Sequence, residues 1–511
     1  MIFFGTPANF VHAQATTQAN LSQQIQNLTD AMARTQAQLE QSQHQLDEMR
    51  KQLSELQRQM AQSGANSATQ PPSGPVSVSP SSSQAQPETT SAAIQDIRER
   101  QTMQASQIAT QEQSKVESES KYSVKVTGLL LLNGFVNTGA VDMAATPTVA
   151  LQGSGSTGAS VRQTVLGLDA RGPHLFGASS YADLRVDFDG SPTTSGSTAT
   201  YSGYYNANTT LLRLRTAHAS LQWGHTKAYF ALDRPIFSPD APTSLTAVAI
   251  PALAWSGNLW TWNPQVGITQ DLGPSDSRDI QLQAALIDVG DAPLLPPTPA
   301  SGTLPVIPPS SAEQSGWPGV EARIALRGPV VNNDGDRSHF GVGGYFAPHY
   351  SNLVGHGFDS WAGTFDAGLL LPAHLEFTVS FYRGQALGGL GGGAYKDFAY
   401  KADTESTGYY FRPLDDVGGW TQLKERVSER LQFNAAFGID NAFANELRRL
   451  YVVSGTTYQN LARNRTYTGN VIYSPSASLQ FSLEYRHLES SPVIGLPAGS
   501  NIFGLGAGYK F

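Results

Sequence analysis

The chain has no cysteine and few charged side chains. None of its 511 residues is Cys, and Asp, Glu, Lys and Arg together make up 14% of the sequence. Without Cys the protein forms neither a disulfide nor a thiolate metal site. Soluble proteins carry about 25% charged residues. The low charge therefore argues against an ordinary soluble enzyme.

Long apolar runs are also absent. A membrane-spanning helix needs about 20 consecutive apolar residues, whereas the runs here, such as Leu129 to Leu132, are only long enough for a strand. The net charge of −8 argues against nucleic acid as a partner. Glycine and tyrosine are abundant instead, with 49 and 19 residues. Together these features favour a transmembrane β-barrel over a cytosolic enzyme.

The last nine residues, FGLGAGYKF, alternate between apolar side chains and Gly or Lys. Alternate residues of a strand lie on opposite faces, so one face of this segment is apolar, as a lipid-facing surface requires. The segment resembles the closing strand of bacterial outer-membrane proteins, whose terminal aromatic residue is read by the barrel-assembly machinery. This resemblance assigns the assembly signal to Tyr509 and Phe511. Leu505 departs from it, because the family usually has a polar residue there.

The first 121 residues show a different organisation. In residues 1–13, an apolar segment and a small-x-small sequence indicate the remnant of a signal peptide. Residues 21–60 carry a heptad seam in which ten of twelve a and d positions are apolar, which predicts a coiled coil over residues 14–62, with a trimer permitted. A single amphipathic helix packed on a domain is the alternative. Residues 63–93 are a Ser- and Pro-rich linker and 94–121 a short polar helix.

From residue 122 to the end, apolar side chains recur at every second position. Because soluble antiparallel sheets alternate as well, the alternation alone does not identify a barrel. We expect sixteen strands, which start near residues 124, 161, 179, 210, 226, 259, 279, 319, 339, 359, 374, 418, 431, 464, 478 and 501.

The connections between these strands alternate between short and long. The short ones include 224–225 and 372–373, and the long ones cover about 139–159, 190–208, 236–258, 289–317, 349–357, 384–416, 440–458 and 488–500. A barrel with both termini in the periplasm has this asymmetry, whereas a sandwich has no reason for it. We therefore predict an all-β fold, a 16-stranded antiparallel transmembrane β-barrel over residues 122–511, preceded by an N-terminal α-helical coiled coil.

A periplasmic coiled coil, a linker and such a barrel together resemble trimeric outer-membrane porins, and most closely the DcaP-like group. Segment VRQTVLGLDARGP, residues 161–173, is similar to the second-strand motif of that group, which usually has a second Arg at the position of Val165. GGWTQLK, residues 418–424, resembles a late-strand motif. The resemblance implies a homotrimer in outer membrane lipid, with its coiled coil in the periplasm. It also implies passive diffusion of small hydrophilic solutes, with no cofactor or metal.

Strand alternation identifies charged side chains that face the barrel interior. The candidates for the pore lining and constriction are Arg185, Arg213, Arg215, Asp183, Asp187, Arg323, Glu321 and Arg486. Lumen charges can select permeating solutes, but they can equally pair across strands and fill the wall. Arg213 and Arg215 lie two residues apart near the third long connection and favour a mild anion preference. Asp183 and Asp187 oppose it.

The third long connection, residues 236–258, is unusually apolar. It contains Leu245, Val248, Ile250 and Trp255. In general porins the third loop folds into the barrel and narrows the pore, and we expect the same here. A surface loop that packs on its neighbours is the alternative.

Motifs of common enzymes are missing. The sequence has no Walker A, GxSxG or HExxH segment. His218 and Ser220 share one face of a predicted strand, but no partner carboxylate is apparent, so we interpret His218 as a wall residue. Three functions stay open: a passive diffusion channel, a plugged barrel that anchors the outer membrane through its coiled coil, and, least supported, a barrel enzyme acting on lipid.

Overall fold

The computed structural model describes residues 122–190, 211–273, 277–292, 309–331, 336–352, 355–402, 409–450 and 460–511. They belong to the second of two compact units, Asp96–Phe511, the first being Met1–Gln95. The predicted signal-peptide remnant, coiled coil, linker and short helix lie outside the described residues. Within the described ranges, no helix is both long and apolar enough to cross a membrane.

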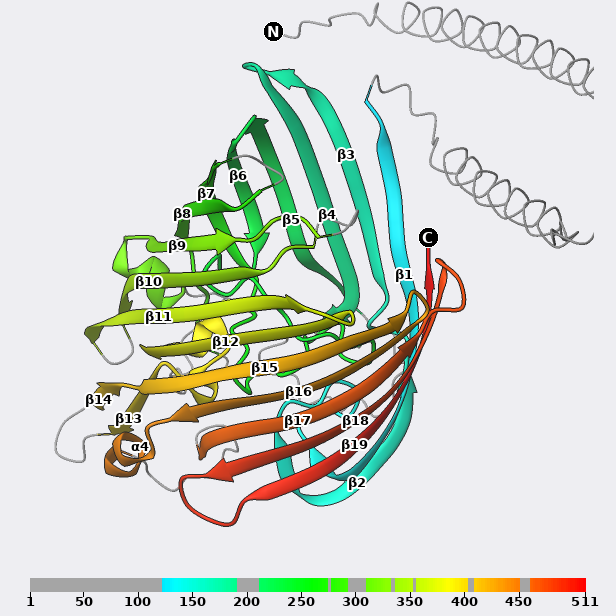
Figure 1. The fold of residues 1–511 in the computed structure, drawn as a ribbon. Coiled ribbons are helices and arrows are strands. Elements are labelled where there is room, and N and C mark those ends of the chain that lie inside the picture. Colours follow the sequence, from blue (N-terminus) through cyan, green and yellow to red (C-terminus); the bar gives the residue numbers. More distant parts are fainter. Residues whose placement is uncertain are drawn as a thin grey trace, which may run out of the picture. The chain divides into compact units, whose positions relative to one another are not determined.

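The sheet closes on itself as a barrel (Figure 1). Strand β2 (Ala150–Ser160) pairs with the end of β1 (Val124–Val141), and β3 (Val165–Leu175) pairs with its beginning. These two segments are therefore one interrupted wall strand, and the 17 strands of the sheet form 16 wall strands. On its other edge β1 pairs with β19 (Ala498–Lys510), which closes the barrel. The predicted 16-stranded antiparallel barrel is confirmed.

The other wall strands follow one another around the barrel in chain order: β4 (Ala178–Gly190), β5 (Leu211–Trp223), β6 (Thr226–Asp233), β7 (Asn263–Leu272), β8 (Asp279–Ile287), β9 (Gly319–Arg327), β10 (His339–Ser351), β11 (His356–Leu371), β12 (Leu375–Gln385), β15 (Asp415–Ser428), β16 (Leu431–Ala442), β17 (Leu461–Tyr473) and β18 (Leu479–Pro492). Strands β13 (Phe398–Ala402) and β14 (Tyr409–Pro413) form a separate hairpin. The short helices are α3 (Ser311–Ser315), α4 (Ala444–Leu450), and the 3-10 turns η2 (Gly388–Leu390) and η3 (Gly393–Tyr395).

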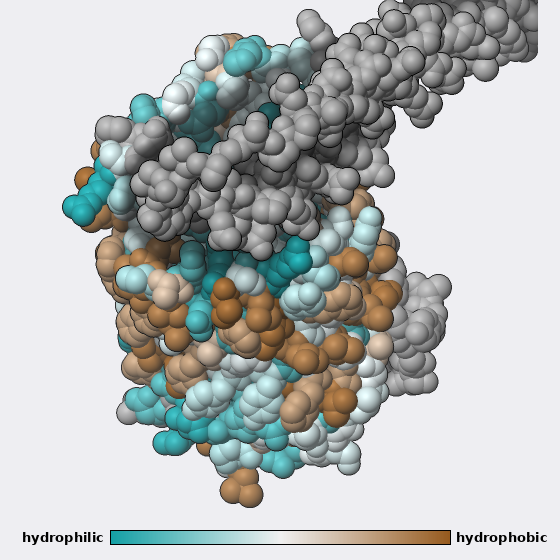
Figure 2. Space-filling view, turned by 45° about the vertical axis from the view of Figure 1, so that its right-hand side comes forward, coloured by the Kyte–Doolittle hydropathy of each residue, from teal (hydrophilic) through white to brown (hydrophobic). Residues whose placement is uncertain are grey.

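Side chains along β19 alternate between the outer and inner faces of the barrel, as the sequence predicts. Phe503, Leu505 and Tyr509 on the outer face are 51%, 54% and 49% exposed, while Ser500 on the inner face is buried. Figure 2 shows hydrophobic side chains gathered across the middle of the wall, where lipid would cover them. Phe511 exchanges both backbone hydrogen bonds with Gly128 of β1, so the terminal residue takes part in closing the barrel.

Three connections are shorter than predicted. The connection expected at 139–159 shrinks to 142–149, that at 349–357 to 352–355, and that at 488–500 to 493–497. The strand pairs extend further because backbone ladders satisfy N–H and C=O groups whatever the side chains are. The long–short contrast is therefore weaker than the sequence suggests.

In place of a conventional core, the barrel interior holds loop residues. One cluster of buried side chains joins Val149, Trp255, Trp260, Tyr395 and Leu447, which come from four different connections or their edges. A second cluster joins Phe237 and Leu390 to wall residues such as Tyr345 and Tyr382. The loops that enter the barrel therefore determine what space remains inside it.

Candidate pore and constriction loop

Residues 234–262, which connect β6 to β7 and are called loop 3 below, lie inside the barrel. The amide of Thr243 donates to Gln422 Oε1 of β15 at 2.6 Å. Ser244 Oγ donates to Glu484 Oε2 of β18 at 2.5 Å. These wall strands lie across the barrel from β6 and β7 in the strand order. Loop 3 therefore crosses the interior.

Further hydrogen bonds hold loop 3 along its length. Asn133 of β1 donates from Nδ2 to the Leu245 carbonyl at 3.1 Å, and Thr364 of β11 donates from Oγ1 to the Phe237 carbonyl at 2.9 Å. Near the other end, Asn464 of β17 donates to the Trp255 carbonyl at 3.1 Å. Of the four apolar side chains expected to be buried, Leu245 and Trp255 are buried and Val248 and Ile250 are half-buried.

Arg213 and Arg215 face the interior on β5 and bind loop 3. Arg213 binds both oxygens of Asp187 through Nε at 3.0 Å and Nη2 at 2.7 Å. The same Nη2 donates to the Ala249 carbonyl, and Arg215 Nη2 donates to the Val248 carbonyl, both at 2.8 Å. Both guanidinium groups also lie over the ring of Trp262, at 5.2 and 5.0 Å from its centroid. These arginines thus position the loop as well as facing the lumen.

The charges around them nearly balance. Arg162 lies 3.5 Å from Asp189, and Asp187 is shared by Arg213 and Arg215. Three guanidinium groups and two carboxylates leave a local charge of +1, three minus two. Any anion preference from this cluster is therefore mild.

Arg185 of β4 pairs in the sheet with Thr216 of β5, close to Arg215, but it binds different carboxylates. It pairs with Asp169 at 2.6 Å and approaches Asp183 at 4.0 Å. His218 bridges Asp183, through Nδ1 at 2.9 Å, and Asp233, through Nε2 at 2.8 Å. With both ring nitrogens engaged by carboxylates, His218 has none left to activate Ser220, which disfavours the lipid-enzyme hypothesis.

The remaining charged candidates make structural contacts. Glu321 Oε2 accepts from the amide of Ile236 at 2.8 Å, where loop 3 begins. Arg486 donates to Glu484 Oε1 at 2.6 Å, and Arg323 is buried against Asp366. These residues face the interior as expected. Their pairing corresponds to the structural alternative that the sequence left open.

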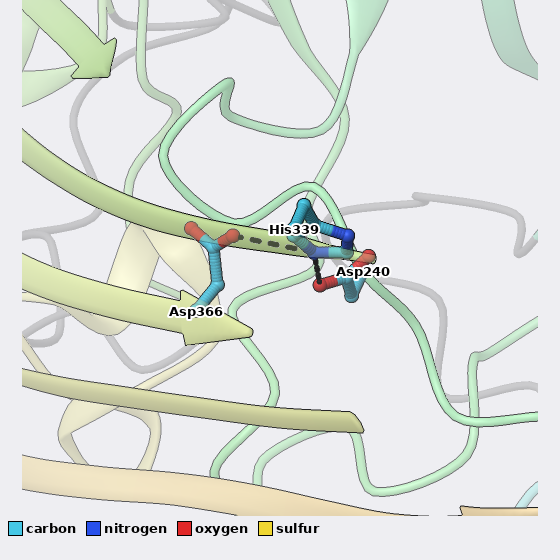
Figure 3. A group of neighbouring side chains, drawn as sticks. All are labelled: Asp240, His339 and Asp366. Atoms are coloured by element: carbon cyan, nitrogen blue, oxygen red, sulfur yellow. Dashed lines mark hydrogen bonds and ion pairs between the residues drawn. The ribbon is translucent and has the colours of Figure 1, made fainter. Parts of the chain in front are cut away.

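A histidine joins loop 3 to the wall at β10 and β11 (Figure 3). His339 Nε2 lies 3.0 Å from Asp240 Oδ2 of loop 3 and 3.5 Å from Asp366 Oδ2 of β11. Three ligand-type atoms within 4.8 Å of one another have the spacing of a metal site. However, Arg323 binds both oxygens of Asp366, at 2.9 and 2.5 Å, so charge pairing alone accounts for the arrangement. We assign the group a linking role.

A second connection, residues 386–414, is called loop 6 below, and its residues 386–397 also lie inside. Its residues Leu387, Leu390 and Ala394 are fully buried. Asp416 and Asp440 accept, through Oδ2, from the amides of Gly393 and Ala394, both at 2.7 Å. Sequence reasoning missed the inward fold of this loop. Its one signal was the glycine-rich run GGLGGGA, since close backbone packing needs small residues.

Loop 6 buries two adjacent ionisable side chains. Burial lowers the pKa of Lys396 to about 7, and its Nζ donates to the carbonyls of Ala394 and Leu461 at 2.7 Å. Burial raises the pKa of Asp397 to about 7, although that carboxylate accepts from the amides of Ala292 and Gly389. Such burial is costly unless the groups are hydrogen-bonded, which fixes the loop tightly.

Two hollows of very different size border loop 3. A cavity of about 860 Å³ lies between Thr243–Leu245 and the short-turn ends of β15 to β18. Between loop 3, residues 146–148 and the wall at Thr466 and Arg486, a cleft holds only about 10 Å³, about one water-sized sphere. Loop 3 thus packs closely at this cleft and leaves open space at the cavity.

No protein-family model and no curated protein matches the sequence. Among solved structures, the outer membrane channel DcaP of Acinetobacter baumannii is 17% identical, with a TM-score of 0.54 over 77% of this chain and 99% of that one. The chain has the fold of an outer membrane channel. OmpF of Salmonella typhi, in complex with daunomycin, is 11% identical, with a TM-score of 0.43 over 77% and 99%. OmpT of Vibrio cholerae is 10% identical, with a TM-score of 0.41 over 78% and 100%. The resemblance to DcaP-like porins is confirmed at the level of the fold.

Proposed function

We propose that this protein is a porin-like channel through which small hydrophilic solutes cross the outer membrane by passive diffusion. The observation that carries the proposal is loop 3, which crosses a closed 16-stranded barrel and is hydrogen-bonded to strands on both sides. A loop held in this way narrows the passage without sealing the wide space beside it. Small cross-sections lined by polar groups select solutes by size and charge.

We further propose a mild anion preference, a homotrimer in outer membrane lipid and a periplasmic coiled coil. The net charge of +1 in the cluster of Arg162, Arg213 and Arg215 supports the first of these. Tyr509 and Phe511 serve as the signal to the barrel-assembly machinery, supported by their position on the outer face of the closing strand.

Purified full-length protein in planar lipid bilayers tests the proposal. We expect stepwise increases of conductance, in groups of three if the channel is a trimer. Replacing Leu39 and Leu46 with polar residues should reduce cross-linked trimer, because both lie on the heptad seam. A protein that inserts and yet conducts nothing would contradict the channel.

A plugged barrel that anchors the membrane is the second candidate. The deep burial of loop 6 and the narrow cleft beside loop 3 favour it. In that case the wild-type protein is silent in the bilayer, and conductance appears only when a loop is shortened. The same measurement on wild-type and loop variants therefore separates the two candidates.

A further inference from the structure

The second wall strand is interrupted, and the interruption changes which residues face inward. Ser160 of β2 pairs with Asn133, whereas Val165 of β3 pairs with Leu129. Inward positions therefore change from even numbers in β2 to odd numbers in β3. At the break, the Thr164 amide donates to the Val161 carbonyl at 3.1 Å. Thr164 Oγ1 accepts from the Leu131 amide, also at 3.1 Å. Irregularities of this kind re-aim side chains near functional sites.

The side chain that the break re-aims is Gln163. Continued alternation from β2 would direct Gln163 toward lipid, yet it is 0% exposed and bound inside the barrel. Its Nε2 donates to the Thr246 carbonyl at 2.9 Å. Its Oε1 accepts from the amides of Val248 and Ala249, at 2.7 and 3.0 Å. One side chain thus makes three hydrogen bonds to three residues of loop 3, Thr246, Val248 and Ala249.

Gln163 completes a set of contacts that the arginines cannot make alone. Arg213 and Arg215 donate to the carbonyls of Ala249 and Val248, and a guanidinium group has no acceptor. In the described part of the chain, Gln163 supplies the hydrogen-bond acceptor for both amides. A buried N–H group without an acceptor is costly. The loop position therefore depends on this amide side chain.

We propose that Gln163 is the positioning residue that fixes residues 246–249 of loop 3 against the wall and so sets the width of the passage. We call the three hydrogen bonds from Gln163 to the loop backbone the grip. The link to permeation rests on the proposed channel function, whereas the grip does not. Because these hydrogen bonds go to backbone atoms, the grip tolerates changes in the side chains of residues 246–249.

A thiol reporter tests the grip independently of conduction. Because the chain has no Cys, Ala247→Cys adds a single thiol at a position that is 7% exposed. In the full-length folded protein, labelling by a charged methanethiosulfonate should be slow. With Gln163→Ala added, we expect labelling to be faster by about tenfold or more, the factor that corresponds to about 1.4 kcal/mol.

Two further variants keep the test decisive. Gln163→Glu, added to Ala247→Cys, keeps the acceptor but loses the donor to Thr246. Its labelling should be faster than that of Ala247→Cys alone, which tests the contact even if Gln163→Ala fails to fold. Gln281→Ala is the matched control, since Gln281 of β8 donates to Asp271 at 3.0 Å, within the wall. Added to Ala247→Cys, it should leave the labelling rate unchanged.

The outcomes separate the grip from the channel. An unchanged labelling rate in folded Gln163 variants would overturn the proposal. A raised labelling rate together with a higher single-channel conductance in Gln163→Ala supports both the grip and its role in permeation. A raised labelling rate in a protein that never conducts would retain the grip and overturn the channel.

Discussion

Loop 3 and loop 6 both fold into the barrel, but residues 246–249 of loop 3 and residues 387–396 of loop 6 are held there differently. The side chains of Gln163, Arg213 and Arg215 bind the backbone of residues 246–249. Wall carboxylates bind the backbone of loop 6 as well, but this loop also buries its own side chains, among them Leu387, Leu390 and Lys396. Residues 246–249 thus depend mainly on hydrogen bonds, whereas loop 6 combines hydrogen bonds with apolar burial.

The difference matters because hydrogen bonds and apolar burial respond differently to change. A typical hydrogen bond contributes about 0.5–1.5 kcal/mol net, whereas full burial of a Leu side chain contributes about 1.5–3 kcal/mol. Loop 3 can therefore be shifted by a few polar substitutions without unfolding the barrel. Loop 6 contributes mainly to stability.

The largest expected effect is on conduction, from deletion of Pro242–Ala252 in loop 3. Because this segment crosses the interior, its removal should raise single-channel conductance strongly while leaving the barrel folded. Bilayer recordings measure the change, and resistance of the folded barrel to detergent at room temperature is the control. Unchanged conductance would mean that the passage lies elsewhere.

Next in size is a stability effect from loop 6. Leu390→Ala should lower the free energy of unfolding by about 2–5 kcal/mol, because it leaves a cavity among fully buried neighbours. The smaller change Val248→Ala in loop 3 should cost much less, since Val248 is only half-buried. Urea unfolding in lipid vesicles measures both. Equal losses of unfolding free energy in the two variants would contradict the proposed difference between the loops.

Loop 6 should also make stability depend on pH. Because Asp397 has its pKa raised to about 7 when folded, the folded state alone keeps this proton between about pH 4 and 7. The free energy of unfolding should therefore fall as pH rises through that range. Asp397→Asn should remove this slope. If the free energy of unfolding still falls with pH in this variant, another ionisable group causes the slope.

Lys396 acts in the opposite direction at higher pH. Its folded pKa of about 7 lies below the ordinary value of 10.5, so between about pH 7 and 10 the unfolded state binds more protons. Stability should then rise with pH. Lys396→Met, which removes the ionisable group, should abolish this rise in the same unfolding assay.

The smallest expected effect is on ion selectivity. Replacing Arg213 and Arg215 with Ala should shift the reversal potential across a KCl gradient modestly toward cations. The shift is small because Asp187 and Asp189 already offset most of the positive charge. Arg465→Ala, which removes an arginine paired with Glu489 on the outer face of β17, is the control. A wild-type channel with clear cation selectivity would contradict the anion preference.

Much of the wall could be predicted from local pattern. Alternation in FGLGAGYKF predicts which face of the closing strand meets lipid, and Phe503 and Leu505 are indeed exposed there. The apolar content of loop 3 likewise pointed to burial. Loop lengths were less predictable, because the strand pair β1–β2 continues through the polar segment QGSGSTGAS, where backbone pairing needs no apolar pattern.

Alternation is a local property of the chain, since successive strand residues must point to opposite faces. The sequence alone therefore determined which face of each strand is apolar, and with the alternating lengths of the connections it predicted a barrel of 16 strands. Tertiary structure decided what happens inside it. Gln163 gains its three partners from residues more than 80 positions away, and the charges of Arg213 and Arg215 are offset by carboxylates on the neighbouring strand. Such contacts depend on register, on a strand break and on where each loop folds, none of which a repeating pattern of apolar residues encodes.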